Sequence, residues 1–525
     1  MTDAISPAAQ PLLITPQERP LPLYTVAQLR GIEAHAAASL PAYTLMARAG
    51  AAAARWLREL AEHDGSLSSA RPVWIAAGPG NNGGDALVVA AELHRAGVAV
   101  QVCMPVEVKP DDARWALDAA RAAGVPISNV PPASFEPYGW LVDGLFGIGL
   151  GRPLEGTFAE LAERIGARAR GEGRVLALDV PSGLDSDTGN IVGGIAAACA
   201  THTVTFIGAK PGLYMLHGRD LAGTVSVAAL GVEAPAATAI ARLNAPELFA
   251  KHFPARAFAA HKGTFGNLAV VGGETGMCGA PILAARAALY TGSGKVHVAF
   301  VGAGAPPYDP PYPELMLHAL DALPLDTMDA LAIGCGMGRT ARAGAALARA
   351  LAVDAPKLID ADALNLIAQA PALANALAAR GAAGDACVLT PHPLEAARLM
   401  GSSAAAVQND RLAAARGLAT RYKSVVVLKG AGTVIAAPDG RTVVNPTGSA
   451  ALATGGTGDV LGGIIGALLA QRLPRYEAAL AGVYLHGLAA DTLTASGIGP
   501  AGLTAGELAP AVRSALNRLI YPRRE

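Results

Sequence analysis

A glycine-rich stretch late in the chain reads Thr454-Gly455-Gly456-Thr457-Gly458-Asp459-Val460-Leu461-Gly462-Gly463. A glycine-rich turn that opens a helix directs several backbone N–H groups at one point, and the helix dipole adds partial positive charge there. This pattern predicts an anion site, most often one for phosphate. Because bound phosphate would repel a carboxylate, Asp459 makes sense if it takes a proton from a hydroxyl while the loop holds a phosphoryl group in transfer. The alternative is an ordinary helix start with an acidic residue in its first turn.

The composition is that of a large globular protein. The 525 residues are 52% hydrophobic and 16% charged, with a net charge of −1, so we expect two or more domains with ample core. The charges form no basic stripe, and aromatic residues make up only 5% of the chain. These features argue against a nucleic-acid partner.

The cysteines and the apolar runs indicate the compartment. The five cysteines are scattered without metal-ligand spacing and have apolar neighbours, which predicts buried free thiols in a reducing environment. The N-terminal residues lack a signal-peptide pattern, and charged residues or glycines interrupt the alanine-rich runs before membrane length. We therefore expect a soluble, cytoplasmic protein without a membrane partner, whose alanine-rich helices favour packing into a homo-oligomer.

Short apolar runs alternate with helical patterns along two halves of the chain. In the first half we expect strands at residues 73–77, 98–104, 140–143, 175–180 and 203–207. In the second half we expect them at residues 268–273, 296–301, 330–333, 357–360, 387–390 and 425–429. The alternation predicts an α/β protein whose parallel sheets are covered on both faces. An Ala- and Pro-rich stretch near residues 231–258 places the domain border between 1–235 and 236–525.

In the first half, polar and glycine-rich turns follow three of the expected strands. Gly78-Pro79-Gly80-Asn81-Asn82-Gly83-Gly84-Asp85 follows one strand and opens a helix, although it is not the dinucleotide pattern Gly-x-Gly-x-x-Gly. Asp143 and Asp179 end two others, and Ser182 follows Asp179 closely. Each aspartate alone is well explained as a cap of a helix or turn. Ligands bind outside the carboxyl ends of parallel strands, so the three together favour a site that gathers Asn82, Asp143, Asp179 and Ser182.

These segments resemble the N-terminal domain of the NAD(P)H-hydrate epimerases, together with Leu23-Tyr24-Thr25, Asp187-Thr188-Gly189 and Lys210-Pro211-Gly212-Leu213. The resemblance implies a Rossmann-like α/β/α sandwich that epimerises hydrated NADH and NADPH at C6 of the nicotinamide ring, with Asp179 as the candidate proton shuttle. It also implies K⁺, a cation suited to hard oxygen donors, on Asn82, Asp143 and Ser182. The hydrate-binding residues that it implies are Asn81, Asn82, Gly83, Gly84, Asp85, Gly147, Ile148, Gly149, Leu150, Gly151, Arg152, Pro153 and Asp179.

In the second half, nearly every expected strand also ends in a polar or glycine-rich turn, as a substrate cleft at one edge of a sheet requires. Several members have simple explanations. His392 is explained as a rigid turn residue between two prolines, Asp360 and Asp362 as helix caps, and Lys429 as a solvated strand end. The turns are His261–Gly266, Gly334–Gly338, Asp360–Leu364, Thr390–Pro393, Lys429–Thr433 and Asn445–Gly448.

This series resembles the ADP- or ATP-dependent NAD(P)H-hydrate dehydratases of the ribokinase-like superfamily over most of residues 256–495. The resemblance implies that the hydrate contacts Ala280, Gly338, His392 and Asp459, and that Mg²⁺ accompanies the nucleotide. It assigns the nucleotide to Lys429, Gly430, Ala431, Gly432, Thr433 and Gly458. The chain departs from the family pattern in three places, most clearly where Gly-Cys-Gly-Met-Gly at 334–338 replaces Gly-Pro-Gly-x-Gly.

The hypothesis from the whole sequence is a bifunctional repair enzyme for the substrates NADHX and NADPHX. Asp459 would take the C6 hydroxyl proton as phosphoryl passes from ADP or ATP, after which phosphate leaves and the dihydropyridine is restored. One alternative is a small-molecule kinase, for example of a vitamin precursor, fused to a hydrate-binding domain. Another is that the first half is a non-catalytic scaffold.

Overall fold

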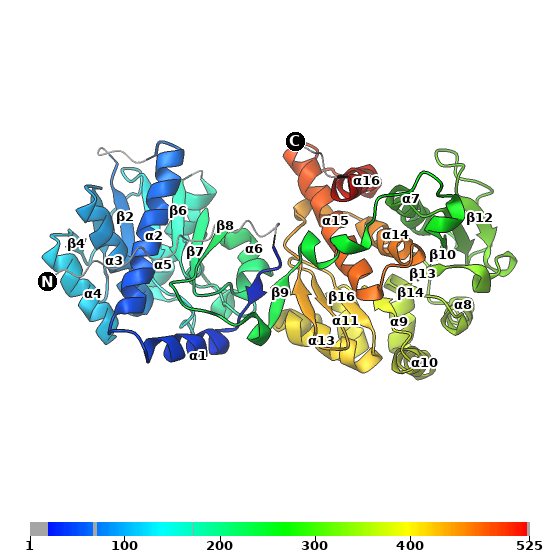
Figure 1. The fold of residues 1–525 in the computed structure, drawn as a ribbon, viewed down its shortest axis with the longest axis horizontal. Coiled ribbons are helices and arrows are strands. Elements are labelled where there is room, and N and C mark those ends of the chain that lie inside the picture. Colours follow the sequence, from blue (N-terminus) through cyan, green and yellow to red (C-terminus); the bar gives the residue numbers. More distant parts are fainter. Residues whose placement is uncertain (1–18, 67–70, 172, 522–525) are drawn as a thin grey trace. The chain divides into compact units, whose positions relative to one another are not determined.

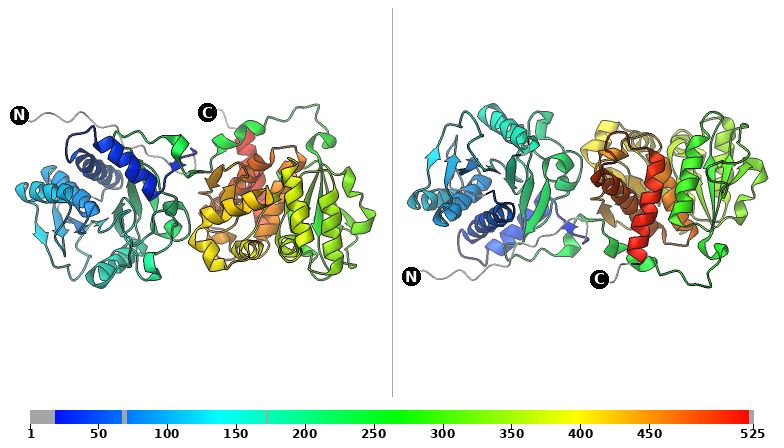
Figure 2. Two further views of the ribbon diagram at one scale, coloured as in Figure 1. Left: turned by 90° about the horizontal axis from the view of Figure 1, so that it is seen from below. Right: turned by 90° about the horizontal axis from the view of Figure 1, so that it is seen from above.

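The computed structural model describes residues 19–66, 71–171 and 173–521. Its contacts divide the chain into two compact units, Leu21–Arg242 and Leu243–Glu525 (Figure 1). In each unit, strands form a layer between helices (Figures 1 and 2). The predicted fold class, a Rossmann-like and a ribokinase-like α/β half, is confirmed.

The first unit is built on a parallel sheet with the order β4-β3-β2-β5-β6-β7-β8. Its strands are β2 (Val73–Ala77), β3 (Val100–Cys103), β4 (Ile127–Ser128), β5 (Trp140–Gly144), β6 (Arg174–Leu178), β7 (His202–Phe206) and β8 (Thr224–Ala228). Its helices are α1 (Val26–Ala37), α2 (Thr44–His63), α3 (Asn81–Arg95), α4 (Asp111–Ala122), α5 (Gly156–Arg170) and α6 (Gly218–Leu221). The order reverses between β2 and β5, and ligands bind at such a switch point.

The two faces of this sheet are covered by different helices. Val73 and Ile75 of β2 pack in one apolar cluster with residues of α2, α3 and α4, whereas Trp74 and Ala76 pack in another with residues of α5. Successive side chains of a strand point to opposite faces, so a strand buried on both faces must be apolar throughout. A short strand, β1 (Pro22–Leu23), pairs antiparallel with β9 (Ala241–Leu243).

The second unit has a parallel core with antiparallel strands at one side. Going across its sheet, the order is β18-β17-β16-β15-β14-β13-β10-β11-β12, and β16, β17 and β18 pair antiparallel. The strands are β10 (Asn267–Gly272), β11 (Lys295–Phe300), β12 (Met316–Ala319), β13 (Ala330–Ile333), β14 (Lys357–Ile359), β15 (Val388–Leu389), β16 (Val425–Leu428), β17 (Val434–Ala436) and β18 (Thr442–Val444). The helices are α7 (Gly279–Thr291), α8 (Ala341–Ala352), α9 (Ala361–Gln369), α10 (Pro371–Ala382), α11 (Pro393–Met400), α12 (Ala404–Asn409), α13 (Arg411–Tyr422), α14 (Thr457–Ala470), α15 (Arg475–Ala495) and α16 (Ala505–Ile520).

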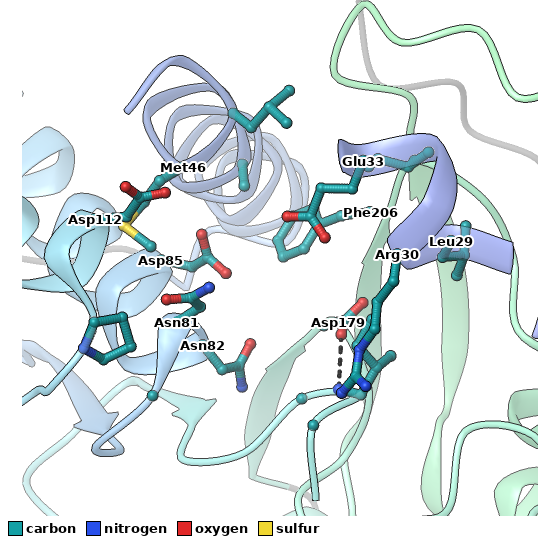
Figure 3. Close-up of a pocket in the computed structure, with 18 of the residues that line it drawn as sticks. Leu29, Arg30, Glu33, Met46, Asn81, Asn82, Asp85, Asp112, Asp179 and Phe206 are labelled. Carbon is teal, nitrogen blue, oxygen red and sulfur yellow. Dashed lines mark hydrogen bonds between the residues drawn. The ribbon is translucent and has the colours of Figure 1, made fainter. Parts of the chain in front are cut away.

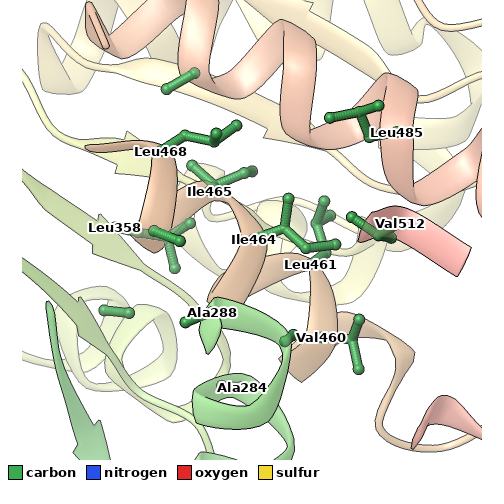
Figure 4. Close-up of a cluster of buried hydrophobic side chains, with 14 of the residues drawn as sticks. Ala284, Ala288, Leu358, Val460, Leu461, Ile464, Ile465, Leu468, Leu485 and Val512 are labelled. Carbon is green, nitrogen blue, oxygen red and sulfur yellow. The ribbon is translucent and has the colours of Figure 1, made fainter. Parts of the chain in front are cut away.

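Helix α14 is the central helix of the second unit. It is apolar all round, as is typical of a helix enclosed by its neighbours, and residues 460–470 are all buried. Figure 4 shows Ile464 and Ile465 of this helix among side chains of its neighbours. A Cβ at Gly463 would lie 1.9 Å from the backbone oxygen of Ala284, so α7 approaches α14 too closely for any larger residue there. This packing fixes the glycine-rich start of α14.

Among the described residues, no helix is both long enough and apolar enough to cross a membrane.

Candidate active sites

The first unit holds a cavity of ≈ 700 Å³ beside the switch point of its sheet (Figure 3). It is bordered by α1, α2, the start of α3, the loop after β5 and the end of β6. Three of the implied hydrate-binding residues, Gly83, Gly84 and Pro153, do not line it. The implied residues that do are Asn81, Asn82, Asp85, Gly147, Ile148, Gly149, Leu150, Gly151, Arg152 and Asp179.

The three residues outside the cavity have packing roles instead. A Cβ at Gly83 would lie 1.8 Å from the backbone oxygen of Gly78, and a Cβ at Gly84 would lie 2.6 Å from the Met46 side chain. Pro153 packs on Gly193, where an added Cβ would approach Pro153 Cγ to 2.2 Å. These glycines therefore allow the close approach of neighbouring segments.

Asp179 is held rigidly at the end of β6. Its backbone has a φ of 67°, a left-handed conformation that is unusual for a residue other than glycine and costs about 1–3 kcal/mol. Its side chain accepts hydrogen bonds from Lys210 Nζ at 2.5 Å and from the Ile148 backbone N–H at 3.1 Å. Backbone strain of this kind persists only where the surrounding structure enforces it, and strained residues cluster at active sites. Asp179 is therefore the strongest catalytic candidate of the cavity.

Lys210 lines the cavity and is a candidate functional residue that the sequence did not reveal. Its side chain is 1% exposed and forms an ion pair with Asp179. The ammonium group also donates to Thr205 Oγ1 at 2.6 Å and to the Phe206 carbonyl at 3.0 Å, so its three donors all have acceptors. In the sequence, Lys210 stood out only as part of the Lys-Pro-Gly-Leu segment. That segment indicates the family, but it does not predict the ion pair with Asp179.

Further carboxylates face the same cavity from three helices. Glu33, Asp85 and Asp112 all line it, and Figure 3 shows Glu33 and Asp85 directed toward the space beside Asp179. Burial raises the pKa of Asp85 well above its usual value, and the charges of Asp179, Glu33 and Asp112 raise it further. Burial also raises the pKa of Glu33, with Asp179 adding to the effect. Both carboxyl groups therefore favour the protonated form more than an exposed carboxyl group does.

The implied cation ligands lie around the loop after β5. Asp143 is fully buried and accepts from the Ser182 hydroxyl at 2.6 Å and the Ser182 N–H at 2.8 Å. Burial raises the pKa of Asp143. Asn82 is 7% exposed, and neither its side-chain oxygen nor its nitrogen has a hydrogen-bond partner among the described residues. A Cβ at Gly147 would lie 2.8 Å from Asp179 Oδ2 and 3.3 Å from Asn82 Oδ1, so Asn82 and Asp179 meet across this glycine.

In the second unit, Asp459 lies in the first turn of α14. The helix begins after Gly456, whose φ of 92° suits glycine. Burial raises the pKa of Asp459 to about 6, and the charge of Asp360 adds to that rise. A hydrogen bond from the Cys335 thiol and the charge of Lys429 oppose it. A carboxylate with this pKa accepts and releases protons readily near neutral pH.

Lys429 and Asp360 join the ends of two strands. Lys429 Nζ donates to Asp360 Oδ1 at 2.7 Å, and Asp360 is 2% exposed. Asp360 does occupy the N-cap position of α9, but its side chain makes no capping hydrogen bond and pairs with Lys429 instead. A Cβ at Gly458 would lie 3.5 Å from Lys429 Nζ. The amine of Lys429 therefore lies beside the start of α14.

The explanation of His392 as a structural turn residue holds in part, because His392 caps the start of α11. Its Nδ1 accepts from the backbone N–H groups of Leu394 at 3.0 Å and Glu395 at 3.1 Å. Glu395 Oε2 in turn accepts from the His392 N–H at 2.9 Å, which completes a capping box. The His392 side chain remains 46% exposed, and its Nε2 lies 3.9 Å from Glu395 Oε1.

The other residues implied for this site lie on loops or at the start of α7. The Gly338 N–H donates to Asp362 Oδ2 at 2.9 Å, and Ala280 lies at the start of α7, where a Cβ at Gly336 would approach it to 3.2 Å. Residues 429–433 form the turn between β16 and β17, which pair antiparallel. Two of its glycines have positive φ, 134° at Gly430 and 68° at Gly432.

Comparison with known proteins matches both units. The family model described as NAD(P)H-hydrate dehydratase matches residues 268–510, and the one described as YjeF-related protein N-terminus matches residues 42–212. The chain is 38% identical to the bifunctional NAD(P)H-hydrate repair enzyme Nnr of Coxiella burnetii, over 94% of this chain and 99% of that protein. It is 49% identical to the ADP-dependent (S)-NAD(P)H-hydrate dehydratase of Neisseria meningitidis, over 51% of this chain and 90% of that protein.

Among solved structures, the second unit is similar to the ADP/ATP-dependent NAD(P)H-hydrate dehydratase of Bacillus subtilis co-crystallized with ATP/Mg²⁺. The identity is 31%, the match covers 51% of this chain and 97% of that one, and the TM-score is 0.43. The near full-length match to the Coxiella protein is the finding that establishes the family. The resemblance predicted from the motifs is confirmed: this chain belongs to the family of bifunctional NAD(P)H-hydrate repair enzymes.

Proposed function

We propose that this protein repairs NADH and NADPH that have become hydrated at C6 of the nicotinamide ring. Residues 1–235 would interconvert the R and S hydrates, and residues 236–525 would dehydrate the S hydrate with ADP, or with ATP. The observation that supports this most is that one chain of this family carries two separate carboxylate sites, Asp179 beside a cavity and Asp459 at a phosphate-type helix start. The comparisons do not favour the kinase alternative.

In the first unit, the hydrate would lie in the cavity with its C6 hydroxyl toward Asp179. The ring-nitrogen electron pair would expel the C6 hydroxyl, and Asp179 in its protonated form would supply the proton with which the hydroxyl leaves as water. Water then adds to either face of the cationic ring and returns the proton to Asp179. Lys210 holds the carboxylate in place during the exchange. Positioned proton transfer of this kind typically contributes about 10²–10⁴-fold to a rate.

We also propose that Asn82, Asp143 and Ser182 hold a K⁺ ion. The buried side-chain oxygen of Asn82 has no hydrogen-bond partner among the described residues, as expected of an atom that awaits a ligand. Carboxylate, amide and hydroxyl oxygens suit a hard cation. When bound, the ion would supply positive charge near the hydrate. Epimerisation should then fall when K⁺ is replaced by tetramethylammonium at constant ionic strength, and Asn82→Ala should abolish that dependence.

In the second unit, Asp459 would act as the base. It takes the C6 hydroxyl proton while the terminal phosphoryl group passes from ADP to that oxygen, leaving AMP. The backbone N–H groups of Gly455–Gly458 and the Lys429 amine stabilise the charge that develops on the phosphoryl oxygens. Phosphate then departs with the C–O electron pair, assisted by the ring nitrogen. Loss of the C5 proton restores the dihydropyridine.

The nucleotide would bring Mg²⁺ with it. Mg²⁺ usually keeps several waters and binds one or two carboxylates besides substrate phosphates. The buried carboxyl groups of Asp360 and Glu395 both interact with the charge of Lys429. They could supply the one or two carboxylates that Mg²⁺ needs. When bound, the ion would neutralise part of the phosphate charge.

The residues that we propose to contact the hydrate in the second unit are Ala280, Gly338, His392 and Asp459.

A reducing, cytoplasmic setting fits the cysteines. All five are free, and four of them are buried. Disulfides are rare in such compartments, where thiols stay reduced. We therefore keep the cytoplasm as the proposed location, and a homo-oligomer as the proposed assembly.

One assay tests the proposed function. A mixture of R and S hydrates is incubated with the protein and MgADP or MgATP, and the absorbance of the restored dihydropyridine and the release of phosphate are followed. Complete conversion faster than spontaneous epimerisation supports both activities. A fast phase that stops near half, followed only by the spontaneous rate, would show that the first unit is inactive. A stable phosphorylated product would instead support the kinase.

A further inference from the structure

A buried arginine lies behind the turn that joins β16 to β17. Arg411, the first residue of α13, is 1% exposed. One of its terminal nitrogens, Nη2, donates to the carbonyl oxygens of Leu428 at 3.0 Å, Lys429 at 3.1 Å and Gly432 at 3.5 Å. The other, Nη1, donates to Gln408 Oε1 at 2.6 Å. The guanidinium group therefore holds carbonyls from both ends of the turn.

The backbone of the turn at residues 429–433 leaves room for the Arg411 guanidinium group. A Cβ at Gly430 would lie 3.0 Å from Arg411 Nη1, and Gly430 has a φ of 134°, so only glycine fits at this position. The Lys429 N–H already donates to the Pro391 carbonyl at 2.9 Å, so an anion at this turn would be met by the backbone N–H groups of Gly430–Gly432, since successive N–H groups can form an anion-binding concavity. Lysine would not reproduce the contact, because its single ammonium lacks the planar fork of arginine.

The charge of Arg411 is not balanced by a carboxylate within ion-pair distance in the described part of the chain. Burial lowers the pKa of Arg411 to about 10, so the group still carries its charge at neutral pH. A buried charge is costly unless it is paired. An anion bound at the opposite side of the turn would provide the missing compensation.

We propose that Arg411 is a positioning residue for the nucleotide diphosphate. It would fix the Lys429–Gly432 turn from behind, and its charge would be balanced across the turn when MgADP binds. This inference rests on the proposed dehydratase function, for which the family resemblance assigns the nucleotide to residues 429–433. It adds a residue that makes no contact with the nucleotide and acts through three backbone carbonyls.

The test measures MgADP binding to the full chain by calorimetry, together with the KM for ADP and kcat. Arg411→Met should weaken MgADP binding about 10- to 100-fold, the scale of lost hydrogen bonds to a charged group, and should raise KM for ADP far more than it lowers kcat. Arg411→Lys keeps the charge and should recover part of the affinity. The matched control is Arg421→Met on the same helix, whose guanidinium donates to the Leu399 carbonyl; it should leave MgADP affinity unchanged.

Wild-type affinity for MgADP in both Arg411 variants would overturn the inference. So would an equal loss of affinity for MgADP and for NADPH, which would show only a general loss of structure. If Arg411→Met does not fold, thermal unfolding will reveal it, and Arg411→Lys still decides, with weaker MgADP binding expected. Failure of the wild-type chain to bind MgADP would instead contradict the proposed function.

Discussion

The two candidate catalytic residues are both aspartates, yet their surroundings are opposite. Asp179 has a strained backbone and its carboxylate is fixed by a buried lysine at 2.5 Å. Asp459 forms no ion pair within the described residues, because Lys429 is paired with Asp360 instead. Burial and the charge of Asp360 raise the pKa of Asp459 to about 6. One carboxylate is fixed in position, whereas the other is tuned in its proton affinity.

This difference fits the two reactions that we propose. An epimerase must exchange one proton with a hydroxyl that leaves from and returns to a ring, so the position of its carboxylate matters most. A base that acts during phosphoryl transfer gains most from a pKa near the working pH. Each variant below should therefore affect one reaction and spare the other.

The largest effect is expected at Asp459. Asp459→Asn removes the base but keeps the shape of the side chain, so dehydration of the S hydrate should fall about 10²-fold or more. The rate is read from dihydropyridine absorbance with saturating MgADP. Epimerisation by the same variant, measured by chromatography of the two hydrates, should remain at the wild-type rate. Dehydration at the wild-type rate would remove Asp459 from the mechanism.

Asp179→Asn should produce the reciprocal result. Epimerisation should slow by about 10²-fold, because the amide cannot carry the proton, while dehydration of pure S hydrate stays unchanged. On mixed hydrates the variant should show a fast phase that stops near half. The ion pair with Lys210 is also lost, so circular dichroism must first show that the variant is folded. Complete fast conversion of mixed hydrates would exclude Asp179 as the shuttle.

A smaller effect is expected on the pH dependence of dehydration, which reports the ionisation of Asp459. Asp459 must be ionised to accept a proton, and burial raises its pKa to about 6. The kcat/KM for dehydration should therefore be level well above this pH and fall about tenfold per unit below it. Single-turnover rates from pH 5 to 8 give the midpoint. A rate that stays level down to pH 5 would contradict this prediction, because the midpoint would then lie near 4, the ordinary value for an exposed aspartate.

The sequence predicted the parts of both sites that lie at strand ends. Parallel strands end at one edge of a sheet, so Asp143 and Asp179 were expected near one another from their positions alone. The strands β17 and β18 were missed because the prediction relied on strands that alternate with helices, whereas β16, β17 and β18 follow one another directly as antiparallel neighbours. Lys210 and Arg411 were missed because their partners are set by tertiary packing. Lys210 pairs with a residue 31 positions away, and Arg411 with carbonyls 17 to 21 positions away.

The smallest expected effect tests a departure from the family pattern at residue 335. The Cys335 thiol is fully buried and hydrogen-bonds with Asp459, which lowers the pKa of that carboxyl. Cys335→Ala should thus raise the pH midpoint of dehydration by about half a unit or less, since a thiol is a weak donor.

Cys335→Ser should move the same midpoint in the opposite direction, because a hydroxyl donates more strongly than a thiol. Cys387→Ala, at another buried free cysteine, is the matched control and should leave the midpoint in place. Movement of both Cys335 variants in one direction would mean that residue 335 acts through packing. Opposite movements would show that the residue standing in place of proline helps to set the proton affinity of Asp459.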